Sequence, residues 1–227
     1  MGLTELEGLA ELKKPVPLAK MAYDALRSSI LTNRLTSDVV YNEKGLAEQL
    51  GISRTPVREA LLELSSQGLV SFLPRKGVVV NKFTSEDIEE IFELRYVIEM
   101  ASVKKICLTW AADDLIPLEK CLEKQKQIVN QVENPIAFME IDRNFHVAIS
   151  QLTGNGRLVA IMQNIRDILQ LMGVRALTAR GRMELVILEH SNILGAIKKR
   201  DVEEALLHMT VHLDQSKAAV KMIKSKQ

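Results

Sequence analysis

The apolar positions in the first third of the chain recur first at helical spacing and then at strand spacing. In "LAKMAYDALRSSILTN" the residues Met21, Ala25, Leu26 and Ile30 share one face, which predicts a helix. Two shorter helical segments follow, "NEKGLAEQL" and "SRTPVREALLELSS", with Gly51 between them. The runs "LVSFLP" and "GVVVN" then flank the turn "RKG" and predict a small β-hairpin. The order is helix, helix-turn-helix and hairpin.

Residues at the ends of the two short helices agree with these boundaries. Asn42 suits the N-cap of the first helix, and Gly51 suits its end. Ser53 or Thr55 caps the second helix, and Pro56 falls in its first turn, where a missing N–H costs little. The apolar stripe of this second helix comprises Val57, Ala60, Leu61 and Leu64.

From "FTSEDIEE" onward the apolar pattern is helical, and no segment favours a strand. Breaks fall at Asp113–Asp114, Asn134–Pro135, Gly154–Gly156, Gly181 and Lys198–Asp201. Helices are therefore expected near residues 85–111, 114–132, 135–152, 156–179, 181–199 and 201–223. The predicted fold is mostly α: an N-terminal arm over 1–16, a helix-turn-helix domain with its hairpin over 17–81, and an all-α helical bundle over 82–227.

Composition narrows the class of protein only slightly. The chain of 227 residues is long enough for two domains or one large one, and its 47% apolar and 26% charged residues are ordinary for a globular protein. The net charge is +1, yet the stretch from Lys13 to Val80 holds ten Lys and Arg against six Asp and Glu. Cys107 and Cys121 lack CxxC spacing, which favours reduced thiols. No signal peptide and no run of about 18 apolar residues is present, so we expect a cytoplasmic protein without a membrane partner.

The second short helix begins with an unusual number of cationic and polar side chains. Arg54 and Arg58 are four positions apart, so they share a face, and the helix dipole disfavours cations at an N-terminus unless an anion compensates. In a helix-turn-helix this end of the second helix enters the major groove of DNA. Lys44 can reach a phosphate, and Arg75 and Lys76 at the hairpin tip can add contacts. The alternative is a solvated cationic helix start.

A family resemblance favours the DNA-binding interpretation. The segment "LAEQLGISRTPVREALLELSSQGLV" closely resembles the winged-helix DNA-binding domain of the GntR family of bacterial transcription regulators, and the resemblance spans Leu18 to Asn81. It departs from the family at "TSDVVY", where a proline-glycine turn is usual, which puts the local turn in doubt. The resemblance implies a winged helix-turn-helix. The residues expected at the DNA are Lys44, Ser53, Arg54, Thr55, Arg58, Arg75, Lys76 and Gly77.

The four histidines of the chain all lie in the helical region. Asp142 and His146 are one helical turn apart in "EIDRNFHVAI", beside inward-facing apolar residues. His190 and His212 lie on two further helices, so three helices can each direct an imidazole to one bundle interior. Imidazoles and a carboxylate suit a divalent transition metal, and bundles build such sites from facing helices. The alternative is a set of unrelated histidines, each satisfied by hydrogen bonds.

A second resemblance favours the metal site. "DRNFHVAI" and "EHSNILGAIKKRDVEEALLHMTVHL" resemble the FCD domain of the FadR-type GntR subfamily over about Ser85 to Val220. In the metal-binding branch of that domain an Asp and three His are the ligands. This resemblance implies Asp142, His146, His190 and His212 as ligands of a divalent transition metal ion, with zinc or nickel favoured.

Three further polar residues carry alternatives. His208 lies outside the motif and, one turn before His212, is the substitute ligand. Arg95 matches a family arginine, so it binds either an effector carboxylate or Glu99. Asn155 in "TGNGRL" also matches the family, and a role in the turn is favoured over a ligand role.

Together these patterns predict a sequence-specific transcription regulator, expected to be a repressor that is relieved by a small organic or sugar acid. A homodimer should read a pseudo-palindromic operator in double-stranded DNA, because two-fold protein symmetry reads two half-sites. One alternative is a regulator for which the metal itself is the signal. A second is a helical-bundle metalloenzyme, for which only Glu140 and Glu189 lie near the ligands as candidate bases.

Overall fold

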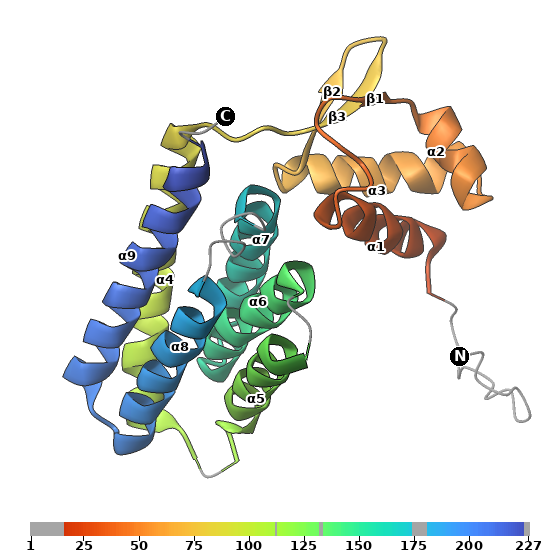
Figure 1. Cartoon of the computed structure of the whole chain (residues 1–227). Helices are drawn as coiled ribbons and strands as arrows, with labels where there is room; N and C mark the ends of the chain where they lie inside the picture. Colours follow the sequence, from red (N-terminus) through yellow and green to blue (C-terminus); the bar gives the residue numbers. More distant parts are fainter. Residues whose placement is uncertain (1–15, 112, 132–133, 174–180, 225–227) are drawn as a thin grey trace, which may run out of the picture.

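The computed structural model describes residues 16–111, 113–131, 134–173 and 181–224 (Figure 1). The expected N-terminal arm therefore lies almost wholly outside the described residues. The first part of the chain forms a small mixed unit, at the upper right of Figure 1. Its elements are α1 (Leu18–Leu31), β1 (Val40–Tyr41), α2 (Glu43–Leu50), α3 (Arg54–Ser66), β2 (Val70–Leu73) and β3 (Gly77–Val80).

The caps of the two helix-turn-helix elements follow the sequence pattern. The side chain of Asn42 accepts a hydrogen bond from the amide of Gly45 at 2.7 Å, which caps α2. Gly51 ends α2 in the left-handed region, with φ of 66°. Of the two residues expected to cap α3, Ser53 occupies the N-cap position, although its side chain makes no capping hydrogen bond.

The wing is a three-stranded antiparallel sheet with the order β1-β3-β2. The short "VVY" segment supplies its edge strand, with Val40 opposite Val79. Gly77 is required where β3 passes β1, because a Cβ there would lie 2.2 Å from the carbonyl oxygen of Tyr41, and its φ is 134°. The backbone geometry therefore explains why glycine is needed at position 77, whether or not this residue contacts DNA.

The core of the first unit confirms the predicted stripe of α3, because Val57, Ala60, Leu61 and Leu64 are all buried. The predicted inner face of α1 is wrong at one position: Met21 is exposed, at 55% of its surface. The buried face of α1 instead begins with Ala22 and Tyr23 and continues through Leu26 and Ile30. The Tyr23 hydroxyl donates to the side chain of Gln67 at 2.7 Å, which turns this face of α1 toward α3 and leaves Met21 on the solvent side.

The rest of the described chain is helical, which confirms the expected fold class. Its helices are α4 (Ser85–Thr109), α5 (Ile116–Gln131), α6 (Pro135–Leu152), α7 (Gly156–Gly173), α8 (Arg182–Lys199) and α9 (Val202–Lys224). The last residues of the helix predicted over 156–179 lie outside the described residues. The first helix ends at Thr109 rather than near 111, because Trp110 is extended and the Asp114 side chain accepts from the Ala111 amide in the turn that follows.

Two features of this bundle position the functional groups. Helices α4 and α9 lie side by side at the left of Figure 1, and α6, α7 and α8 lie next to them. Helix α7 also faces the first unit, where Ile168 and Leu171 pack against the core of α1 and α3. Helix α7 is therefore in contact with both halves of the molecule.

None of the described helices is long and apolar enough to span a membrane, and Cys107 and Cys121 are free thiols.

Candidate metal centre and DNA-binding surface

Three helices bring one carboxylate and three imidazoles together in the interior of the bundle. Asp142 and His146 come from α6, His190 from α8 and His212 from α9, and all four are buried. Their potential ligand atoms lie within 4.8 Å of one another. The substitute ligand, His208, lies elsewhere: its Nε2 is 3.7 Å from Glu204, and 28% of its side chain is exposed.

Each imidazole of the cluster is held through Nδ1 by an oxygen acceptor. The pairs are His146 with Glu99 Oε2, His190 with Gln125 Oε1 at 2.9 Å, and His212 with Glu189 Oε2 at 2.7 Å. A carboxylate or amide oxygen can only accept, so Nδ1 carries the proton and Nε2 of a neutral ring keeps its lone pair. The three lone pairs therefore belong to the nitrogens on the inner side of the rings.

The inner nitrogens have the character of metal ligands. His146 Nε2 lies 3.3 Å from Arg95 Nη2, which can donate to it, and 3.1 Å from His212 Nε2. At 3.1 Å two lone pairs repel unless a proton or cation lies between them. His190 Nε2 is buried and has no hydrogen-bond partner in the described part of the chain, yet it lies 3.5 Å from Asp142 Oδ1. A buried nitrogen without a hydrogen-bond partner is costly. The lone pairs of these Nε2 atoms are therefore suited to bind a cation.

The electrostatics of the site favour neutral imidazoles beside an ionised carboxylate. Burial lowers the pKa of His146 well below its ordinary value, and the charges of Arg166 and Arg95 lower it further. Burial likewise lowers the pKa of His190. For Asp142 burial alone would raise the pKa, but the charge of Arg166 holds it below the usual range. Neutral imidazole and carboxylate are the forms that bind metal ions.

Three guanidinium groups surround the cluster, and each is paired with a carboxylate. The pairs are Arg95 with Glu99 at 2.7 Å, Arg182 with Glu189 at 2.6 Å and 3.1 Å, and Arg166 with Asp142. All three arginines are buried. With the imidazoles neutral, these positive and negative charges balance before any ion binds.

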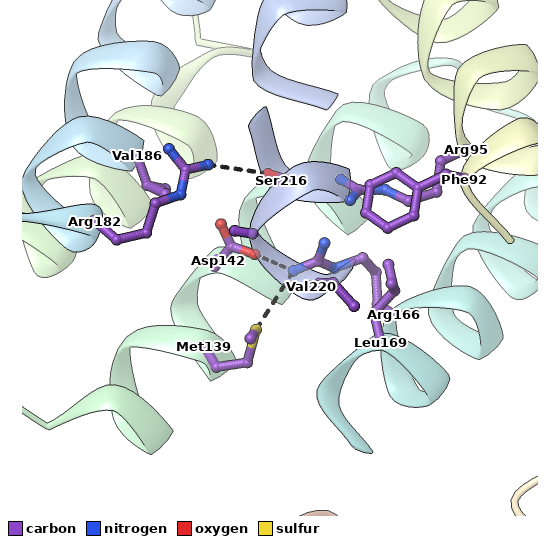
Figure 2. Close-up of a pocket in the computed structure, with 11 residues that line it drawn as sticks. Phe92, Arg95, Met139, Asp142, Arg166, Leu169, Arg182, Val186, Ser216 and Val220 are labelled. Carbon is purple, nitrogen blue, oxygen red and sulfur yellow. Dashed lines mark hydrogen bonds and ion pairs between the residues drawn. The ribbon is translucent and has the colours of Figure 1, made fainter. Parts of the chain in front are cut away.

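Beside the cluster lies a cavity of about 40 Å³ that five helices line (Figure 2). Figure 2 shows Arg166 reaching Asp142 on one wall and Arg182 reaching Ser216 on another. Arg95 also lines it, so the expected Glu99 ion pair exists and the same guanidinium still borders the cavity. About 10–15 Å³ suffices for one water, so the space has room for about three water-sized groups.

Sequence reasoning missed part of this site. Gln125, Arg166 and Arg182 had not been singled out, although Arg166 gives a weak signal as a charge between the apolar residues Met162 and Leu169 of one helix face. The two candidate bases are placed differently from each other. Glu189 is engaged by His212 and Arg182, whereas Glu140 is exposed.

The predicted DNA-contacting side chains lie on the outside of the first unit. Arg54 and Arg58 occupy the first turns of α3, with 66% and 63% of their side chains exposed, and both pair with Glu43 at 3.4 Å. Lys44 is 75% exposed and lies 3.7 Å from Glu48. Ser53 at the N-cap of α3 and Thr55 in its first turn are also exposed. Arg75 and Lys76 are exposed in the turn between β2 and β3, and the half-buried Gly77 begins β3.

One ionic contact connects the two halves of the molecule. Arg27 of α1 donates two hydrogen bonds to Asp167 of α7, and Arg143 of α6 donates to the same carboxylate at 2.8 Å. Asn164 of α7 also donates to the backbone carbonyl of Gln67 at 2.7 Å. Asp167 and Arg143 directly follow Arg166 and Asp142 in the chain, so the Asp–His cluster and this interface share two pairs of neighbouring residues.

Asn155 has the favoured role in a turn, because its side chain accepts hydrogen bonds from the backbone amides of Arg157 and Leu158.

Comparison with known proteins agrees with both halves. Residues 18–80 match the bacterial regulatory protein gntR family, and residues 90–215 match the FCD domain. The HTH-type transcriptional repressor RspR of Escherichia coli is 24% identical over 94% of this chain and 93% of its own. The gluconate operon transcriptional repressor of Bacillus licheniformis is 26% identical over 86% and 82%.

Solved structures agree at the level of the fold. The E. coli McbR/YncC structure superposes with a TM-score of 0.80 at 24% identity, and the match covers 92% of this chain and all of the other. A GntR regulator from Rhodococcus gives a TM-score of 0.79 at 23% identity over 89% and 96%. The FCD match spans more than half of the chain and begins ten residues after the gntR match ends. The chain belongs to the GntR family of bacterial transcription regulators and carries an FCD domain as its C-terminal part.

Proposed function

We propose that this GntR-family regulator is a repressor whose affinity for its operator is set by a small organic or sugar acid, bound at a divalent metal ion in the FCD domain. The observation that carries the proposal is the arrangement of His146, His190 and His212, each held by an acceptor at Nδ1 around Asp142. Such outer hydrogen bonds fix ring orientation and ligand basicity in metal sites.

The residues that would hold the ion are Asp142, His146, His190 and His212. A set of imidazoles with one carboxylate suits zinc or nickel. When bound, the ion supplies an electropositive centre that attracts an anionic oxygen. Glu99, Gln125 and Glu189 keep the rings in place, and the partnerless Nε2 of His190 gains a partner.

The charge balance favours an anionic effector. The three buried Arg–carboxylate pairs leave the site neutral, so a divalent ion adds uncompensated positive charge in a place where charge is costly. A carboxylate in the adjacent cavity would offset that charge, and Arg95 and Arg182 border the cavity as further donors. The gluconate operon repressor of B. licheniformis, similar to this chain over most of its length, agrees with a sugar acid as effector and with repression.

On the DNA side, we assign base or phosphate contacts to the exposed tip of α3 and to the wing. Arg54 and Arg58 can address base edges, and Thr55 and Lys44 the backbone. Ser53, Arg75, Lys76 and Gly77 complete the proposed surface. The exposure of the α3 arginines at the end of a helix whose other face is buried supports this assignment.

A second copy of the chain is the expected partner of an apolar face on the bundle. Leu94, Val97 and Leu108 of α4 are exposed, as are Leu207 and Val211 of the adjacent α9. Helices α4 and α9 pack side by side, and exposed apolar side chains gathered on neighbouring helices are typical of an interaction site. We expect Val97→Glu to convert a homodimer into monomers in sedimentation equilibrium, and an unchanged mass would place the interface elsewhere.

Metal analysis and calorimetry test the effector site together. Purified protein should retain about one divalent transition metal ion per chain after dialysis, and His208→Ala should retain it equally. A panel of sugar acids and dicarboxylates is then titrated into the metal-loaded protein, the metal-stripped protein and a His146→Ala variant. We expect tight binding and reduced operator affinity only with metal. Metal lost on dialysis, with operator binding that follows free metal concentration, would instead support a metal sensor.

A further inference from the structure

A carboxylate lies between the two arginines at the tip of α3. Glu43 is the first residue of α2, and its Oε2 is 3.4 Å from Arg54 Nη2 while its Oε1 is 3.4 Å from Arg58 Nη1. Only 14% of the Glu43 side chain is exposed, against 66% and 63% for the two arginines. Each oxygen of the largely buried Glu43 carboxylate therefore forms an ion pair with one exposed arginine.

The position of this carboxylate is fixed by the fold. Asn42 caps α2 directly before Glu43, and an acid is favoured in the first turn of a helix. Cations are disfavoured at the start of α3, so Arg54 and Arg58 need an anion nearby. Glu43 supplies it from the neighbouring helix, and without it two long side chains would sample many rotamers.

The ion pairs leave most donors of the arginines available. A guanidinium has five N–H donors, and the contact to Glu43 is made through Nη2 of Arg54 and Nη1 of Arg58. The remaining donors can still address a guanine edge, which takes a bidentate pair. A phosphate that binds the same arginines, by contrast, competes with Glu43 and is repelled by its charge. Glu43 therefore opposes binding to phosphates more strongly than binding to bases.

We propose that Glu43 is a positioning residue that sets DNA specificity: it orients Arg54 and Arg58 toward bases and weakens their binding to DNA of any sequence. The proposal rests on the DNA-contacting role of the two arginines given above. The proposal goes beyond that role because Glu43, which contacts the arginines, contributes to the discrimination between the operator and other DNA.

The test compares two duplexes and uses the full-length protein. One duplex is selected by the wild-type protein from a random library, and the other is its scrambled sequence with equal length and composition. In Glu43→Gln we expect tighter binding to the scrambled duplex and a fall of about tenfold in the ratio of the two affinities. The salt dependence of scrambled binding should steepen by about one phosphate contact.

Glu48→Gln is the matched control, because it removes an equal charge from the same helix, where Glu48 is 67% exposed and lies near Lys44. It should change both affinities by a similar factor and leave their ratio intact. Glu43→Asp keeps the charge but shortens the side chain, so it should lower the ratio without strengthening scrambled binding. A wild-type ratio in Glu43→Gln or Glu43→Asp, or an equal fall in Glu48→Gln, overturns the proposal.

A double-mutant cycle separates this inference from the proposed function. In an Arg54→Ala/Arg58→Ala background, Glu43→Gln should leave the ratio unchanged, because the residues through which it acts are absent. If the arginine substitutions alone preserve the ratio, the proposed DNA contacts are wrong, and the role of Glu43 fails with them. If they abolish discrimination while Glu43→Gln has no effect in the wild-type background, only the role of Glu43 fails.

Discussion

The metal cluster and the tip of α3 use the same kinds of side chain in opposite surroundings. Around Asp142 the side chains of Arg95, Arg166 and Arg182 are buried, and each is paired with a carboxylate. At the tip of α3, Arg54 and Arg58 are mostly exposed and share the one carboxylate of Glu43. Buried charges must be matched within the protein because water cannot solvate them. Exposed charges stay solvated and available to a partner outside the protein, which we propose is DNA.

This difference determines how each region responds to substitution. A change inside the cluster leaves another polar group buried without its partner, so ligand binding and folding stability should fall together. A change at the tip of α3 removes a solvated side chain, so DNA binding should fall while stability stays nearly constant.

The largest effect is expected at the tip of α3. Arg54→Ala combined with Arg58→Ala should weaken operator binding by about 2–6 kcal/mol, since each base-directed contact contributes roughly 1–3 kcal/mol. The free energy of unfolding should change by less than about 0.5 kcal/mol for each exposed site. Fluorescence anisotropy with an operator duplex and urea denaturation measure the two quantities.

Arg157→Ala is the control for this experiment, because Arg157 is an exposed cation on the bundle rather than on the winged helix. Operator affinity should be retained in that variant. Wild-type affinity in the double variant would remove the tip of α3 from the proposed DNA surface, and a large loss of stability would contradict the contrast with the cluster.

The next effect concerns the metal ligands. Added zinc or nickel at 100 times its dissociation constant should stabilise the stripped wild-type protein by about 2.7 kcal/mol. His146→Ala and His190→Ala should lose this stabilisation and also unfold more readily without metal, because Glu99 or Gln125 then lacks its imidazole. Thermal unfolding with and without metal gives both values. Full stabilisation in both variants, as expected for His208→Ala, would exclude this cluster as the metal site.

The elements of the fold follow closely from the sequence, because apolar spacing and capping residues act locally. Asn42 and Gly51 bound α2 as expected, and the stripe of α3 is buried. The error at Met21 arose because a periodic pattern alone does not fix the rotation of a helix. The bulky Tyr23 and its hydrogen bond to Gln67 set that rotation, and Gln67 is distant in the sequence.

The candidate site could be predicted only in part for a similar reason. Asp142 and His146 are linked by helical spacing. His190 and His212 were candidates because they lie on two further helices, and a family resemblance favoured them as ligands. The residues that orient the rings have no such pattern: Gln125 is one polar residue among many on α5 and becomes distinct only when α5 packs beside α8. Which carboxylate faces which arginine likewise depends on packing between helices.

Gln125 therefore offers a more selective test of the cluster. Gln125→Leu removes the acceptor of His190 Nδ1 while leaving all four proposed ligands, so metal affinity should fall about 10- to 100-fold, the usual cost of losing such a partner. Gln127→Leu on the exposed side of α5 is the matched control and should bind metal normally. Competition with a fluorescent chelator measures both affinities. Equal affinity in the two variants would mean that His190 is oriented by other contacts.

The smallest expected effect links the two regions. Arg166 and Asp167 are neighbours on α7, yet the first holds Asp142 at the cluster and the second holds Arg27 of the winged helix. A shift of α7 on effector binding would therefore move both contacts. An effector changes DNA affinity only through its differential binding to two states, and residues that carry such coupling contribute about 0.5–2 kcal/mol.

Asp167→Asn weakens the ion pairs to Arg27 and Arg143 without touching a proposed ligand, so metal and effector affinities should be retained. The effector-induced loss of operator affinity should shrink by about 2- to 30-fold. Asp24→Asn, an exposed acid on α1 paired with Lys20, should leave it unchanged. An effector response in Asp167→Asn equal to that of the wild type would show that the cluster communicates with the winged helix by another route, such as the apolar contacts of Ile168 and Leu171.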